Sequence, residues 1–131
     1  MNDTQVFPTI RLNPGSKASD FQTANDTLRN QGGGFIELTP GAAYKMDAGF
    51  ILDVGAGVGL RGNTAIFDFT GMTTGVCINL NARRRNPDNF PVPGYDGATG
   101  NYHQTRTYVG NFGMIGPGKA VTGVTAIDID Q

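Results

Sequence analysis

Glycine interrupts this chain more often than a helical protein allows. It fills 20 of the 131 positions, roughly double its usual share of about 7%. Charged helix formers are scarce, because the sequence holds one glutamate and three lysines, so helical bundles and coiled coils are excluded. The glycines follow no strict three-residue period, which excludes collagen. The length fits one domain, and we predict a turn-rich β protein.

Short apolar runs separate the glycines and have the composition of β-strands. Most of them span three to five residues, and Pro-Gly, Gly-Asn and Thr-Gly pairs stand between them as turns. The predicted strands are residues 35–38, 44–46, 50–54, 58–61, 65–69, 76–80, 108–109, 112–115 and 124–129. Strands this short and this frequent are more typical of the coils of a β-solenoid than of a β-sandwich.

One segment, residues 19–31, has the pattern of a helix. Ser19 and Gln22 have the three-residue spacing of a capping box, and three consecutive glycines end the segment. The apolar stripe of this helix is narrow and consists of Phe21, Ala24 and Leu28. A helix with so little apolar surface is stable only when it is docked. We therefore expect it to cover the end of the core.

The strand region repeats itself. Thr74-Gly75-Val76 followed by Ile78-Asn79-Leu80 recurs as Thr122-Gly123-Val124 followed by Ile127-Asp128-Ile129, at an offset of 48. Without the long segment 81–107 this offset falls to 21, and the strand centres Ile36 and Leu60 have an offset of 24. A period in the low twenties, with three short strands per turn, is what a parallel β-solenoid requires.

The order of motifs along the first half of the chain is distinctive. A short helix is followed by Gly33-Gly34-Phe35-Ile36-Glu37-Leu38, a Pro40-Gly41 turn and a strand that ends in Leu60-Arg61-Gly62. This order resembles the opening of the right-handed parallel β-helices of the pectate-lyase superfamily, and most closely its phage tailspike and tail-fibre branch. The resemblance covers about residues 19–80 and continues more weakly over 108–130. It implies an all-β fold, a right-handed parallel β-helix with one short N-terminal capping helix.

The resemblance also implies a function. Phage spikes of this type are often homotrimers that bind or cleave surface polysaccharide. We therefore expect a structural and receptor-binding module, located in a virion or outside the cell, that contacts polysaccharide and other virion proteins. A fragment of a polysaccharide-degrading enzyme, or a small virion decoration or adaptor protein, remain as alternatives. A last coil without a cap would expose apolar edges, so we expect a truncated chain or one sealed by partners.

Hydrolysis of a sugar chain needs two carboxyl groups about 5 to 9 Å apart. Asp128 and Asp130 share one face of a predicted strand at roughly 7 Å, and they are the weak catalytic candidates. Acids in such positions are usually only solvated. Arg61 is expected to be structural, and Cys77 lies in an apolar run where an inert thiol is the default. The sequence thus leaves enzymatic activity open.

The long segment 81–107 is predicted to be a loop inserted into the strand region 35–131, which follows an extended lead-in, 1–18, and the helix with its turn, 19–34. Loops of this length are often functional. Arginine supplies a cationic cluster, and aromatic rings supply flat faces that stack on sugars or anchor interfaces. The predicted binding residues are Arg83, Arg84, Arg85, Phe90, Tyr95 and Tyr102. A solvated loop, a contact with another subunit and a glycan site all remain open.

The net charge of −1 and the pI of about 5.6 make nucleic acid an unexpected partner. No apolar run approaches the length of a membrane span, about 18 residues, so we expect no membrane insertion. One cysteine and one histidine exclude the usual Cys/His zinc sites. The glycine-rich segment 57–62 precedes a strand pattern rather than a helix, which argues against a dinucleotide site. We predict no cofactor and no metal.

Overall fold

The fold consists of short strands and one α-helix within the residues that the computed structural model describes, 8–82, 95–96, 101–102 and 107–130. The helix is α1 (Ala18–Asn30), and a short 3-10 helix, η1, spans Val54–Ala56. The strands are β1 (Thr9–Leu12), β2 (Gly34–Leu38), β3 (Ala43–Lys45), β4 (Phe50–Leu52), β5 (Val58–Asp68), β6 (Thr74–Asn81), β7 (Tyr95–Asp96), β8 (Asn101–Tyr102), β9 (Val109–Ile115) and β10 (Gly123–Asp130). The described part of the chain is therefore mostly β. None of the helices in these ranges is long and apolar enough to cross a membrane.

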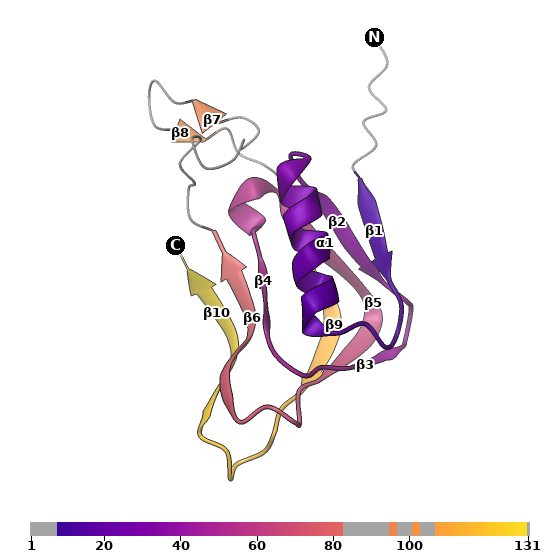
Figure 1. Cartoon of the computed structure of the whole chain (residues 1–131), viewed down its shortest axis with the longest axis vertical. Coiled ribbons are helices and arrows are strands. Elements are labelled where there is room, and N and C mark those ends of the chain that lie inside the picture. Colours follow the sequence, from indigo (N-terminus) through magenta and orange to yellow (C-terminus); the bar gives the residue numbers. More distant parts are fainter. Residues whose placement is uncertain (1–7, 83–94, 97–100, 103–106, 131) are drawn as a thin grey trace.

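Parallel strands form the two main sheets. In the larger sheet β1 pairs with β2, β2 pairs with the first part of β5, β3 pairs with the second part of β5, and β9 pairs with β5 along its other edge. In the smaller sheet β6 lies between β4 and β10. Figure 1 shows the smaller sheet on one side of α1 and most of the larger sheet on the other. Apart from β7 and β8, which pair with each other in a separate two-stranded sheet, the strands after β3 alternate between these two sheets along the chain.

The strand register agrees with the internal repeat and corrects its offset. Ile36 of β2 pairs with Leu60 of β5, at the predicted offset of 24. In the smaller sheet Ile78 pairs with Ile127, so the offset between these strands is 49 and not 48. The stacking of apolar side chains sets this register, because a shift of one residue would turn the apolar positions away from the core.

Helix α1 starts one residue earlier than predicted and has a different cap. Lys17 occupies the N-cap position, and the Asp20 carboxylate accepts a hydrogen bond from the Lys17 backbone N–H at 2.8 Å. The predicted capping box of Ser19 and Gln22 is therefore wrong, because both residues lie inside the helix. The reason is that Asp20 places a carboxylate in the first turn, where it meets the unpaired N–H groups and the positive end of the helix dipole.

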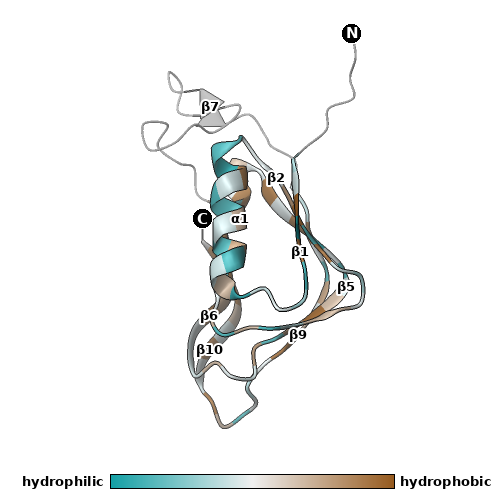
Figure 2. Ribbon diagram, turned by 45° about the vertical axis from the view of Figure 1, so that its right-hand side comes forward, coloured by the Kyte–Doolittle hydropathy of each residue, from teal (hydrophilic) through white to brown (hydrophobic). Residues whose placement is uncertain are grey.

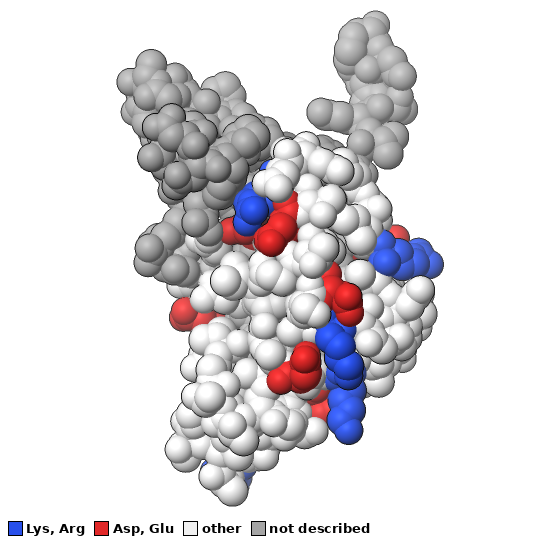
Figure 3. Space-filling view, viewed as in Figure 1, with Lys and Arg blue, Asp and Glu red and all other residues white. Residues whose placement is uncertain are grey.

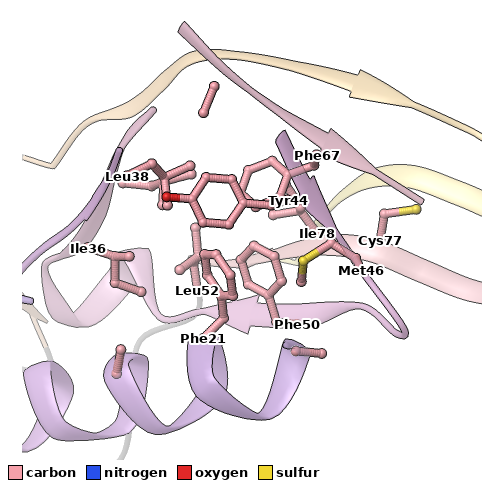
Figure 4. Packing of buried hydrophobic residues seen from close by; sticks show 14 of the residues in the cluster. Phe21, Ile36, Leu38, Tyr44, Met46, Phe50, Leu52, Phe67, Cys77 and Ile78 are labelled. Atoms are coloured by element: carbon pink, nitrogen blue, oxygen red, sulfur yellow. The ribbon is translucent and has the colours of Figure 1, made fainter. Parts of the chain in front are cut away.

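The core lies between the two sheets and is closed at one end by α1. Phe21 of α1 is fully buried and stacks on Phe50, with ring centroids 4.7 Å apart. Phe67 of β5 is central, since its ring centroid lies between 5.4 and 5.9 Å from those of five other aromatic residues (Figure 4). The predicted apolar stripe of the helix is buried as expected, and Figure 2 shows the hydrophilic colour concentrated on the other side of α1.

Glycine is required where neighbouring strands approach most closely. A Cβ atom on Gly49 would collide with a carbonyl oxygen of β6, and one on Gly62 would collide with a carbonyl oxygen of β9. Beside Gly62 the long strand β5 turns a corner at Asn63, which has φ +53. Asparagine tolerates this left-handed conformation better than most residues, and its side-chain amide donates to the Leu38 carbonyl at 2.8 Å. The high glycine content thus reflects close packing of backbone as well as turns.

Candidate functional site

Most of the loop predicted to bind a partner lies outside the described residues. This holds for Arg83, Arg84, Arg85 and Phe90. Tyr95 and Tyr102 are placed by their backbone as opposite residues of the antiparallel strands β7 and β8. The structure therefore brings these two positions together, and the binding role of the loop stays a prediction.

The two weak catalytic candidates both lie on β10. Asp128 is exposed and pairs in register with Asn79, and Asp130 pairs with Asn81. The acids occupy alternate positions of one strand, as the sequence indicates, and their catalytic role stays a prediction. Among the described residues, no three His, Cys, Asp or Glu side chains lie close enough together to hold a metal ion.

An open groove of about 470 Å³ lies against β4 and β6. Its walls come from Gln22 of α1, the segment 47–51, residues 71–76, which lead into β6, and Asn79. Asn79 pairs with Ile51 of β4 on one side and with Asp128 of β10 on the other. Asp128 therefore lies one strand away from the groove wall, at a strand spacing of about 4.8 Å. Sequence patterns did not reveal this groove, because its residues are distant along the chain.

Hydrogen bonds fix two polar side chains of the groove in place. The Gln22 side-chain oxygen accepts a hydrogen bond from the Ile51 backbone N–H at 3.0 Å. The Asp47 carboxylate accepts one from the Ala18 N–H at 3.1 Å, and this bond, with further backbone N–H donors, holds the pKa of Asp47 below its usual range. Asp47 is therefore an ionised acceptor at neutral pH and is poorly suited to act as a general acid.

Charges around the groove are sparse. None of the described residues that line it is lysine or arginine, and Asp47 is its one charged member. Figure 3 shows the face that carries α1, where acidic and basic side chains form small mixed groups and uncharged atoms cover the rest. Ile51 adds an apolar contact surface, because this residue is 42% exposed.

A buried polar cluster joins α1 to the smaller sheet. The Asp53 carboxylate, 2% exposed as a residue, accepts hydrogen bonds from the side-chain amides of Asn25 at 2.8 Å and Asn81 at 2.9 Å. Arg29 donates to the same carboxylate at 3.3 Å. Sequence reasoning missed this cluster, although Asn25 stands four residues after Phe21 and therefore on the apolar face of the helix. These contacts give the cluster a structural role.

The outer face of the larger sheet carries a second set of polar contacts. The Arg61 guanidinium carbon lies 3.9 Å from the centre of the Phe35 ring, a cation–π geometry. On the strands beside it, Arg11 of β1 pairs with Glu37 of β2 at 3.2 Å. This hydrogen bond is the main reason that the pKa of Glu37 lies below its ordinary value. The contact with Phe35 is consistent with the structural role expected for Arg61.

Cys77 does not have the surroundings of a nucleophile. The residue is buried at 2% exposure, with its sulfur 3.8 Å from the sulfur of Met72. Burial raises the pKa of the Cys77 thiol, so the reactive thiolate is disfavoured.

Comparison of the chain with protein-family models, with curated proteins and with solved structures gives no match.

Proposed function

We propose that this chain forms a right-handed parallel β-helix module of a phage tail spike or fibre, and that it contacts a surface polysaccharide through the groove. The repeated parallel register supports the fold part of the proposal. Three layers follow one another along the chain, β2–β4, β5–β6 and β9–β10, and each layer pairs in parallel with the one before it. Stacking each layer on the previous one is how a solenoid buries its core.

The observation that carries the binding proposal is the groove itself. Its volume of about 470 Å³ is within the usual range of ligand sites. Asn79 and Thr74 bring an amide and a hydroxyl group, which are able to donate to and accept from sugar hydroxyls. Ile51 offers an apolar surface for the C–H face of a sugar ring. Because no described cation lines the groove, a neutral sugar fits it better than an acidic one.

The ionisation state of the acidic residue in the groove favours binding over hydrolysis. A glycosidase needs one carboxyl group with a raised pKa and a second one close to it. Asp47, the acid that lines the groove, has a lowered pKa. This argues for a binding surface, and release of reducing ends from a polysaccharide would instead support the enzyme alternative.

A matched pair of isoleucines tests the proposal. Ile51 lies in the groove and is 42% exposed, whereas Ile66 lies on β5, outside the groove, and is 40% exposed. We expect Ile51→Ala to weaken binding of a neutral oligosaccharide about fivefold, which corresponds to a loss of about 1 kcal/mol, and Ile66→Ala to leave it unchanged. Isothermal titration against neutral and acidic bacterial oligosaccharides measures both variants.

Two results of that titration contradict the proposal. One is the absence of binding to every oligosaccharide at millimolar concentration. The other is an equal loss of affinity in the two variants, because the groove would then not be the site. Asn79→Ala, which removes the amide from the groove wall, should also weaken binding without changing the unfolding temperature by more than a few degrees.

We further propose that the module works as a homotrimer, as phage spikes of this type often do. Light scattering coupled to size exclusion measures the mass of the chain in solution. A mass of three chains supports this association, and a stable monomer at micromolar concentration contradicts it.

A further inference from the structure

The outer face of the larger sheet carries an arginine whose hydrogen-bond donors are not used. Arg61 of β5 is exposed, while Leu60 before it and Gly62 after it are buried. Its guanidinium carbon lies 3.9 Å from the centre of the Phe35 ring. This contact uses the flat face of the guanidinium and not its N–H groups, which lie in the plane. Among the described residues, none forms a hydrogen bond or an ion pair with this side chain.

The carboxylate that faces Arg61 in register is already engaged. Glu37 of β2 pairs with Arg61 along the strands, but its carboxylate accepts hydrogen bonds from Arg11 at 3.2 Å and from the Asn63 amide at 3.5 Å. Arg11, Glu37 and Arg61 follow one another across β1, β2 and β5. This row holds two positive charges and one negative charge, so an anion is able to bind Arg61 without breaking the existing ion pair.

Glycine makes room for an aromatic ring on each side of the strand that carries Arg61. A Cβ atom on Gly59 would lie 2.8 Å from the Phe35 ring, and one on Gly110 would lie 2.9 Å from the Tyr108 hydroxyl oxygen. Strand β5 lies between β2 and β9, and Gly110 is the register partner of Arg61. The phenol of Tyr108 therefore covers the position beside Arg61, and this residue is 51% exposed.

This arrangement fits a ligand that carries a carboxylate on a ring. The planar N–H groups of arginine match the two oxygens of a carboxylate, and the exposed Tyr108 ring beside them offers a flat surface for the C–H face of a sugar. A peptide fits less well. Because β5 is paired along both edges, it has no free backbone row to which an extended peptide could add.

We propose that the outer face of the larger sheet binds an acidic sugar, with its carboxylate on the Arg61 guanidinium and its ring on Tyr108. We call Phe35, Arg61 and Tyr108 the arginine site. The proposal goes beyond the groove and does not rest on it, because no residue of the arginine site lines the groove. Figure 2 shows β1, β2 and β5 on one side of the molecule and β6 and β10 on the other.

Two tetrasaccharides and a matched pair of cations test the proposal. Isothermal titration uses a tetramer of glucuronic acid and the glucose tetramer of the same linkage, which lacks only the carboxylates. Arg61→Gln should weaken binding of the acidic tetramer at least about tenfold and leave binding of the neutral one unchanged. Lys45→Gln removes the same charge from an exposed position of β3 in the same sheet, and it should leave both unchanged.

Two further measurements locate the ligand. Tyr108→Ala should weaken binding of the acidic tetramer by a smaller factor than Arg61→Gln does, while Ile51→Ala, in the groove, should not affect it. In the wild-type protein, the Nε–H resonance of Arg61, assigned by its absence in Arg61→Lys, should shift on addition of the acidic tetramer and not of the neutral one. This resonance reports on the site even if a variant fails to fold.

Four outcomes overturn the proposal. The acidic tetramer could fail to bind at millimolar concentration, Arg61→Gln and Lys45→Gln could weaken it equally, or Ile51→Ala could abolish its binding, which would place it in the groove. A peptide of four glutamates could also bind as tightly with the same dependence on Arg61, which would identify an acidic peptide as the occupant. Failure of the groove proposal is distinct, because it would appear in the neutral titration and leave the effect of Arg61→Gln intact.

Discussion

Replacing Asn25 by alanine should loosen the attachment of α1 to the sheets. Its side chain makes two buried hydrogen bonds of 2.8 Å with Asp53, one to the carboxylate and one from the backbone N–H. Alanine deprives each of these groups of one partner. Loss of a partner in a buried site costs about 1 to 3 kcal/mol per group, so for the two groups we expect a loss of about 2 to 6 kcal/mol in the free energy of unfolding.

Urea unfolding followed by circular dichroism measures this loss. Thr23→Ala is the control, because Thr23 is exposed on the same helix and its removal should change stability by less than about 0.5 kcal/mol. If the stability of Asn25→Ala differs from that of the wild type by no more than this control does, the cluster does not anchor the helix.

Asn25→Asp tests the same contact through its pH dependence. A second carboxylate facing Asp53 would have a raised pKa in the folded state, because two carboxylates at hydrogen-bond distance resist joint ionisation. The folded protein would then bind more protons than the unfolded chain, so stability should fall as pH rises above about 4. Urea midpoints that do not improve from pH 7 to pH 5, relative to wild type, would refute the argument.

Three further predictions concern packing, reactivity and pH. Gly49→Ala should destabilise the protein by at least about 2 kcal/mol, because its Cβ meets the β6 backbone, while Gly71→Ala, which has open space around it, should be nearly neutral in thermal unfolding. The Cys77 thiol should react with a thiol reagent at least about 100-fold more slowly in the folded protein than in urea, because the residue is only 2% exposed and burial also raises the pKa of its thiol. The pKa of Glu37 is lowered by Arg11, so its contribution is present above the unfolded pKa and is lost as pH falls through the folded one. Arg11→Ala should therefore reduce the acid sensitivity of the urea midpoint below about pH 4, and an unchanged slope would show that the ion pair does not contribute.

The sequence by itself determined the local features of this protein. Glycine content, short apolar runs and the three glycines after residue 31 were enough to predict a β-rich chain with one helix, because these signals act over a few residues. The docking face of α1 was also predictable, since Phe21, Ala24 and Leu28 recur at helical spacing and are buried. The pairing of Ile36 with Leu60 followed from a repeat of apolar residues.

Only the tertiary structure decided the features that depend on contacts between distant residues. The offset of β10 on β6 comes from the stacking of Ile127 on Ile78, which sequence similarity alone places only within one residue. The polar cluster joins Asn25 to Asp53, 28 positions away, and the groove combines α1 with two strands and a turn. Propensity and periodicity describe each segment separately, whereas these sites exist only after packing has fixed which segments are neighbours.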